Sequence, residues 1–181
     1  MENIRAFICI TFQNEIIKEI TRIQSLVSKT KFTGSLTAPE NLHLTLKFLG
    51  EIPPEKLEEV KALLSNIKFN PFETSLQHTG TFSHHKKPRI TWMKISSKPL
   101  FDLQKQIDET LSPLFQKEER FMSHLTLARI KYVKSPPNFI KYINQIKPKK
   151  LKFQVSSFKL ISSDLKPLGP NYSLIEEYKL K

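Results

Sequence analysis

The chain has 181 residues, of which 39% are hydrophobic and 25% are charged, a composition typical of a globular protein long enough to bury a sizeable core. No apolar run approaches the roughly 18 residues of a membrane span, and the opening MENIRAFICITF lacks a secretory signal pattern, so no membrane association and a cytoplasmic location are expected. The net charge of +12 suggests a polyanionic partner such as nucleic acid. Cys9 is the single cysteine, which excludes an intrachain disulfide and a thiolate zinc site.

The first half of the chain alternates strand and helix patterns. Residues 5–12 alternate as a strand, and residues 14–29 carry a stripe of branched apolar side chains that predicts a helix beginning at Asn14. A strand follows and ends at Gly50, and Pro53-Pro54 suits the first turn of a helix over 55–67. Two strands are then expected over 72–82 and 89–96, joined by the polar connection SHHKKP.

The second half repeats this alternation. A helix is expected from Leu100 to the residue before Pro113, a strand over 120–130, and a short helix over 135–146 that begins at a proline pair. Two further strands, 152–165 and 172–180, flank the turn KPLGPN at 166–171.

The tetrapeptide HLTL occurs twice, at residues 43–46 and 124–127, in a chain with five histidines. Each copy is preceded by a strand and a helix and followed by a proline pair, a helix and two strands, and the offset of 81 residues is close to half the chain. We therefore predict a duplicated α+β unit: two antiparallel sheets flanked by helices, related by a pseudo-twofold axis, with a central cleft. Residues 1–181 are expected to form one bilobal catalytic domain whose lobes share strands.

Alternation along a strand puts His43 and Thr45 on one face, with Leu42, Leu44, Leu46 and Phe48 on the other. His124 and Thr126 share a face in the same way. Two imidazoles and two hydroxyls are therefore expected to face one cleft. One imidazole can accept a proton while the other donates one, and hydroxyls can bind phosphoryl oxygens, which suits the opening of a cyclic phosphodiester by water. No metal site is expected, because two histidines without nearby Asp, Glu or Cys at ligand spacing are too few.

The segments ENLHLTLKFLGEIP (40–53) and SHLTLARIK (123–131) closely resemble the two signature segments of the RNA 2',3'-cyclic phosphodiesterase family, also called 2'-5' RNA ligases, of the two-histidine phosphoesterase superfamily. The segments RAFICITF, GTFSHHKKPRITW and SDLKPLGPNYSLIEEY extend the resemblance over nearly the full length. The resemblance implies a bilobal fold and hydrolysis of a terminal RNA 2',3'-cyclic phosphate to a 2'-phosphate without metal or other cofactor. Its implied partners are RNA ends, including tRNA halves, and a monomer is expected.

The resemblance also implies roles for single residues. His43 would be the proton donor and His124 the proton acceptor, although the pseudo-symmetry leaves their order open, and Thr45 and Thr126 would hold the phosphate. Arg129 would contact the phosphate, a role that requires a strand end or bulge because simple alternation turns it away from His124. The remaining substrate-binding candidates are Phe48, for which core packing is the alternative, Phe82 as a base-stacking residue, and Lys87 and Arg89 for backbone phosphates beyond the reactive end.

Two other functions fit the same residues. The active site could serve 2'-5' RNA ligation or the hydrolysis of 2'-5' linkages, because forward and reverse reactions share their catalytic groups. A protein of another class, a non-catalytic basic RNA-binding module, would explain the charge but not the intact His-x-Thr pattern in both halves.

The sequence departs from the family pattern beside the second histidine. Met122-Ser123 stand where relatives often have Arg-Pro, which removes a cation at this place.

Overall fold

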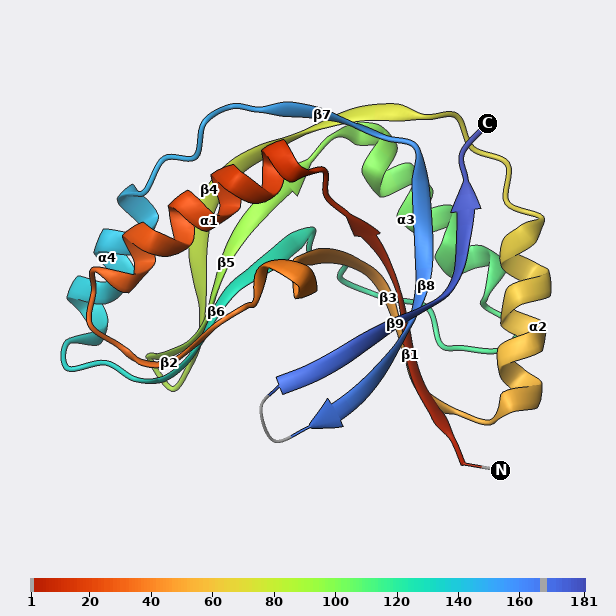
Figure 1. Cartoon of the computed structure of the whole chain (residues 1–181), viewed down its shortest axis with the longest axis horizontal. Coiled ribbons are helices and arrows are strands. Elements are labelled where there is room, and N and C mark those ends of the chain that lie inside the picture. The colour runs from red at the N-terminus through yellow and green to blue at the C-terminus, as the bar shows by residue number, and fades with distance from the viewer. Residues whose placement is uncertain (1, 167–168) are drawn as a thin grey trace.

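The computed structural model describes residues 2–166 and 169–181, and within them the chain forms an α+β fold. Its strands and helices, coloured from the N-terminus to the C-terminus in Figure 1, alternate as the sequence predicted. In chain order they are β1 (Ile4–Thr11), α1 (Asn14–Ser28), β2 (Thr33–Leu36), the short 3-10 helix η1 (Pro39–Asn41), β3 (His43–Ile52), α2 (Pro54–Ser65), β4 (Phe72–His84), β5 (Lys87–Ser96), α3 (Lys98–Thr110), β6 (His124–Tyr132), α4 (Pro136–Gln145), β7 (Lys152–Val155), β8 (Ser157–Lys166) and β9 (Gly169–Lys179).

Four segments differ from the sequence prediction. The strand β2 and the helix η1 were not predicted, because neither has an apolar pattern: every residue of β2 is exposed. Most of the connection SHHKKP belongs to the strands. Its turn consists of His85 and Lys86, and both have positive φ, because the turn of a two-residue hairpin needs this conformation to match the twist of the flanking strands. The segment 152–165 forms two strands, because β7 pairs with β4 and β8 pairs with β1. The predicted turn at 166–171 lies partly outside the described residues.

The strands join into one antiparallel sheet in the order β7-β4-β5-β6-β3-β1-β8-β9, with β2 paired to β6. Two separate sheets were expected. They are instead joined at their centre, where β3 and β6 pair antiparallel at Leu44 and Leu125, one leucine from each HLTL. The α+β class and the bilobal arrangement are confirmed, and the pseudo-twofold axis passes between the two repeated tetrapeptides.

The two halves of the chain are interleaved. The order β1-α1-β3-α2-β4 in the first half matches β5-α3-β6-α4-β8 in the second. We call the strands β3, β1, β8 and β9 the first lobe, and β6, β5, β4 and β7 the second lobe. The first lobe thus takes β1 and β3 from the first half of the chain and β8 and β9 from the second, and the second lobe takes β5, β6 and β7 from the second half and β4 from the first.

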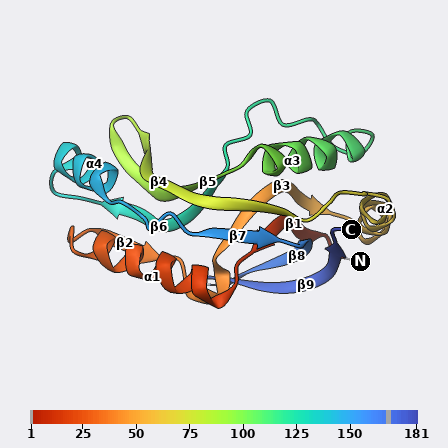
Figure 2. The ribbon, with the colours of Figure 1, turned by 90° about the horizontal axis from the view of Figure 1, so that it is seen from above.

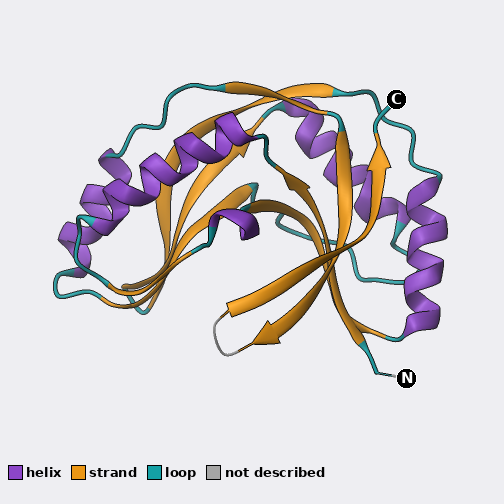
Figure 3. Ribbon diagram, in the orientation of Figure 1, coloured by secondary structure: helices purple, strands orange, loops and turns teal. Residues whose placement is uncertain are grey.

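Some of the helices also pack on strands that come from the other half of the chain. Helix α1 packs on β6 and α4 packs on β4 and β5, whereas α3 contacts β3 and α2 contacts α3 and β9 (Figures 2 and 3). Their apolar stripes cover the leucine and isoleucine side of the sheet, including Leu44, Leu46, Leu125 and Leu127, each at most 2% exposed. The opposite side of the central strands is left free for the polar motif residues. Among the described residues, no helix is long and apolar enough to cross a membrane.

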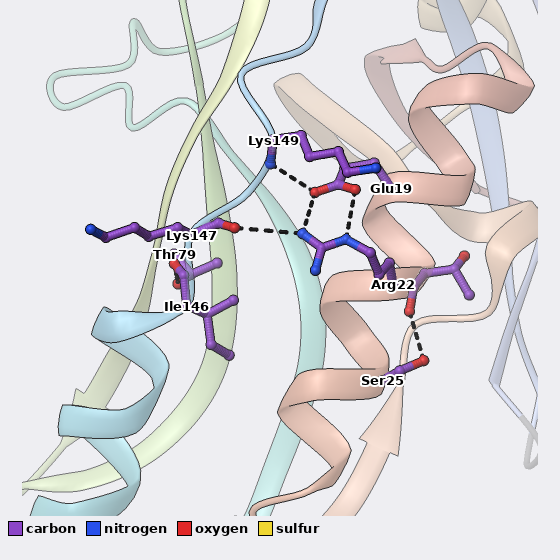
Figure 4. Close-up of polar contacts among 8 residues, drawn as sticks. Glu19, Arg22, Ser25, Thr79, Ile146, Lys147 and Lys149 are labelled. Carbon is purple, nitrogen blue, oxygen red and sulfur yellow. Dashed lines mark hydrogen bonds and ion pairs between the residues drawn. The ribbon is translucent and has the colours of Figure 1, made fainter.

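A polar cluster fastens α1 to the connection between α4 and β7 (Figure 4). The Arg22 guanidinium donates two hydrogen bonds to the Glu19 carboxylate, at 2.8 and 2.6 Å, and this pairing lowers the pKa of Glu19. The Lys149 backbone N–H donates to the same carboxylate at 2.8 Å. The buried Glu19 charge is therefore paired and hydrogen-bonded, which is the condition for tolerating it in an interior.

Candidate active site

The two His-x-Thr motifs line one open pocket of about 510 Å³ between the lobes. His43, Thr45, His124 and Thr126 all border it, while the leucines that alternate with them are buried on the other side of the sheet. Continued by one residue on each side, the antiparallel pairing of Leu44 with Leu125 sets His43 opposite Thr126 and Thr45 opposite His124. The fold therefore brings all four predicted motif residues together.

Both imidazoles are oriented by the same backbone contact. Nδ1 of His43 lies 2.7 Å from the carbonyl oxygen of Asn41, and Nδ1 of His124 lies 2.7 Å from that of Met122. A carbonyl oxygen can only accept, so each Nδ1 carries a proton and donates it. Each Nε2 is thereby left to exchange a proton in the cleft. Nε2 of His43 also lies 3.1 Å from the Thr45 hydroxyl.

Aromatic rings hold the two imidazoles in place. Phe7 contacts the His43 ring at a centroid distance of 4.8 Å and Tyr172 meets its edge at 5.3 Å, while Phe82 contacts the His124 ring at 4.9 Å. Burial lowers the pKa of His43, and the positive charges of Arg129 and His124 lower it further against the opposing effect of the Asn41 carbonyl. His43 is therefore biased toward its neutral form in the free protein.

Two β-bulges bring further side chains into the pocket. In β3 the register with β1 passes from Thr45 to Lys47, and in β6 the register with β5 passes from Thr126 to Ala128, so Leu46 and Leu127 are the extra residues. Each bulge turns the following side chains over, which places Phe48 and Arg129 on the same face as the histidines. The bulge that the predicted role of Arg129 requires is present.

Simple alternation gave the wrong side for Phe48. Its predicted position beside Leu46 in the core is incorrect, because the side chain is 52% exposed and borders the pocket. The Arg5 guanidinium lies 4.8 Å from the centre of the Phe48 ring. Phe48 therefore presents an aromatic surface at the position that is equivalent to Arg129 in the other lobe.

The other predicted binding residues do not border this pocket. The Phe82 ring contacts the rings of His124 and Trp92. The Trp92 ring lies so close to Gly80 that any side chain at position 80 would collide with it. Lys87 and Arg89 lie at the outer end of the β4–β5 hairpin and border a separate pocket. The structure therefore brings together Arg129 and Phe48 with the motif residues and leaves Lys87 and Arg89 outside.

Several pocket residues were missed by the sequence reasoning. Tyr172 of β9, Arg5 of β1 and Ser35 of the unpredicted β2 all border the pocket. Arg5 and Tyr172 lie inside segments that carry the family resemblance, which was the available signal; Ser35 gave none. Burial of Cys9 raises the pKa of its thiol to about 12, which is typical of a structural rather than a reactive cysteine. Among residues 2–166 and 169–181 there is no group of three His, Cys, Asp or Glu side chains that could hold a metal ion.

Comparisons with known proteins agree with this geometry. The family model described as LigT like Phosphoesterase matches residues 10–92 and 95–172. The RNA 2',3'-cyclic phosphodiesterase of Methanocaldococcus jannaschii is 34% identical, over 96% of this chain and 99% of that protein, and the one of Thermotoga maritima is 32% identical, over 96% and 94%. The crystal structure of TT0787 of Thermus thermophilus superposes with a TM-score of 0.83 at 28% identity and covers 97% of each chain. The chain therefore belongs to the LigT-like phosphoesterase family.

Proposed function

We propose that this protein is an enzyme that hydrolyses the terminal 2',3'-cyclic phosphate of RNA to a 2'-phosphate, with two histidines as acid and base and without a metal ion. One observation carries the proposal: two imidazoles, each oriented by a backbone carbonyl, offer their Nε2 atoms to one pocket. Membership in a family whose relatives are named RNA 2',3'-cyclic phosphodiesterases supports the substrate class. We further propose that the protein acts as a monomer, because the duplication supplies both histidines within one chain, and that it acts in the cytoplasm, since its opening residues lack a secretory signal pattern.

The proposed reaction is an in-line displacement at phosphorus. Nε2 of His124 accepts a proton from water, the water oxygen forms a new bond to phosphorus, and the bond from phosphorus to O3' breaks. Nε2 of His43 donates a proton to the departing O3', which leaves a 2'-phosphate and a 3'-hydroxyl. Each histidine ends in the protonation state opposite to its starting one, and exchange with water restores both.

The charge that develops on the phosphoryl oxygens needs fixed donors. The Thr45 and Thr126 hydroxyls and the Arg129 guanidinium border the pocket, and we assign them the role of donating to these oxygens. The Arg129 guanidinium and the phosphate have opposite charges. A bound phosphate would therefore offset the effect of Arg129 on His43 and raise the pKa of that imidazole, which the donor role requires.

The test is an end-chemistry assay. An oligonucleotide that ends in a 2',3'-cyclic phosphate, mixed with the protein in the presence of a chelator, should yield the 2'-phosphate alone. His43→Ala and His124→Ala should each lower kcat by about two to four orders of magnitude, because general acid or base catalysis contributes that much. His78→Ala is the matched control, since His78 lies on β4 outside the pocket, and it should keep wild-type activity.

Three results would contradict the proposal. A 3'-phosphate product would show that the other bond breaks, and loss of activity in chelator that returns with added metal would contradict the metal-free mechanism. RNA binding that falls with salt and survives both histidine substitutions, with no turnover by the wild type, would support a non-catalytic binding module instead.

A further inference from the structure

Positive charge is concentrated in one lobe of the molecule. Residues 74–101 and 120–163 contain 15 of the 29 Lys and Arg residues and none of the 17 Asp and Glu residues. The other residues, with 14 basic and 17 acidic side chains, carry a net charge of −3 against +12 for the whole chain. These two segments form nearly all of β4, β5, β6, α4 and β7, together with the start of α3 and the first seven residues of β8. Only Lys98 and Lys159 of the 15 basic residues lie in α3 and β8, so most of this positive charge belongs to the second lobe, which carries His124.

Within this lobe, a basic patch lies at the far end of β6 from the active site. We define it by the residues that border a pocket of about 290 Å³ and have exposed side chains: Lys87, Arg89, Lys131, Tyr132 and Lys134. Among the described residues, none of its four cations takes part in an ion pair shorter than 4.0 Å. Unpaired cations grouped around a concave surface indicate a site for an anionic partner.

Tyr132 narrows the class of partner. It is 64% exposed, the largest exposed fraction of any aromatic side chain among the described residues, and it is surrounded by lysines. An exposed aromatic ring beside cations is the arrangement by which proteins stack and hold the bases of single-stranded nucleic acid. A free phosphate would make no use of the ring, whereas the bases of a nucleic acid would stack on it.

The patch is connected to the active site by β6 itself. His124 begins this strand, Arg129 follows the bulge, and Lys131 and Tyr132 end the strand. Ile130, which lies between Arg129 and Lys131, is buried, so the side chains of Arg129 and Lys131 extend to the same, exposed side of the strand. Tyr132 lies eight residue steps after His124 along the strand, which is about 26 Å at the usual rise. That distance is several nucleotides of an extended strand.

We propose that the RNA strand leading to the cyclic phosphate lies along β6, past Arg129, and that a base several nucleotides before the reactive end stacks on Tyr132 within the basic patch. The proposal rests on the proposed function, because it assumes that the reactive end occupies the pocket of the two histidines. It names the substrate as a single-stranded RNA end of several nucleotides rather than a cyclic mononucleotide. The residues outside the two basic segments carry a net charge of −3, which makes them a less favourable path for a polyanion.

The test compares two substrates on the same variants. Lys131→Gln/Lys134→Gln and Tyr132→Ala should each lower kcat/KM for an oligonucleotide with a 2',3'-cyclic end by about fivefold or more, as expected for lost phosphate contacts or a lost stacked base. The kcat/KM for a mononucleotide 2',3'-cyclic phosphate should stay unchanged. Tyr132→Phe should retain oligonucleotide activity, because it keeps the ring.

Lys68→Gln/Lys105→Gln is the matched control, since both lysines are exposed, lie on the other side of the molecule near α2 and α3, and change the net charge equally. It should leave both substrates unaffected. If the patch variants lose activity on both substrates alike, or on neither, the docking proposal is overturned while the proposed function stands. If the wild type opens neither substrate, the proposed function fails first.

Discussion

The imidazoles of His43 and His124 are oriented by backbone carbonyls rather than by carboxylates. A carbonyl fixes the tautomer as well as a carboxylate does, but it carries no full negative charge to stabilise the imidazolium. Burial and the nearby Arg129 and His124 charges therefore prevail at His43 and lower its pKa. The free protein thus favours the neutral form of His43, and the negative charge of a bound anion would favour its protonated form.

This difference between the free and the bound site predicts two distinct pH profiles. If His43 is the donor, kcat/KM should fall as the pH rises through a pKa below the ordinary 6.5, because kcat/KM reports the free protein and His43 must be protonated. In the complex the phosphate raises this pKa, so the same limb of the kcat profile should lie at higher pH. Stopped or continuous assays across pH check both.

The variants assign the two limbs. Residual activity of His43→Ala should lack the limb at which activity falls with rising pH, and that of His124→Ala should lack the limb at which activity falls with falling pH. The reverse pattern would exchange the donor and acceptor roles of the two histidines. Because the groups interact, each limb gives an apparent pKa of the pair rather than of one ring.

At the scale of the elements, the site depends on the two bulges that follow the His-x-Thr pairs. The sequence was sufficient to predict that four side chains face one pocket: His43, Thr45, His124 and Thr126. Alternation holds over the three residues of each motif, and the repeat marks the two strands. It was insufficient for Phe48, because the bulge at Leu46 reverses the alternation. The bulge at Leu127 is held by contacts distant in sequence: its carbonyl accepts hydrogen bonds from the Thr37 N–H and from the Gln24 side chain. No local pattern in the sequence reports such contacts.

The same limit applies to the strands. The helices and most strands followed from periodicity and proline positions, whereas β2 and the division of 152–165 into β7 and β8 follow from pairing with distant strands. The joining of the two expected sheets depends on one pair of leucines at the centre. Local pattern predicts which segments are strands, and the partners along the edges are decided by tertiary packing.

A buried ion pair supports the bulge in β3. The Lys47 ammonium, 7% exposed, pairs with the Asp108 carboxylate of α3 and donates to the Gln116 carbonyl at 3.0 Å, while the Glu118 N–H donates to Asp108 at 2.9 Å. Asp108→Asn should lower the free energy of unfolding by about 3 to 5 kcal/mol, because it leaves a buried charge without its partner. Chemical denaturation measures the loss.

Two further variants make this prediction specific. Lys47→Met/Asp108→Asn should recover part of the stability, because both charges are then absent and the amide oxygen can still accept from Glu118. Asp102→Asn removes the partner of an exposed pair, Lys98–Asp102, and should cost less than about 1 kcal/mol. Equal losses in Asp108→Asn and Asp102→Asn would show that burial of the first pair is of no consequence.

For the whole molecule, duplication and charge have separate consequences. The interleaved halves give two equivalent sets of pocket residues across one axis, since each lobe contributes a histidine, a threonine and a bulge. The charges do not follow this symmetry, because the second lobe lacks carboxylates over residues 74–101 and 120–163. The motif residues are therefore arranged pseudo-symmetrically while the charge is not, and an RNA strand bound as proposed is expected to approach from one side.

This polarity predicts how salt affects activity. Each phosphate neutralised on a single strand contributes a slope of about −0.7 to the dependence of log binding on log salt, so three or more contacts along the second lobe should give a slope of about −2 or steeper for kcat/KM on RNA. A cyclic mononucleotide reaches the pocket alone and should show a slope shallower than about −1. Assays of both substrates across a salt series, with one anion throughout, measure the difference. Equal slopes would mean that the RNA beyond its reactive end does not contact the charged lobe, because contacts to successive phosphates cannot form without releasing their counterions.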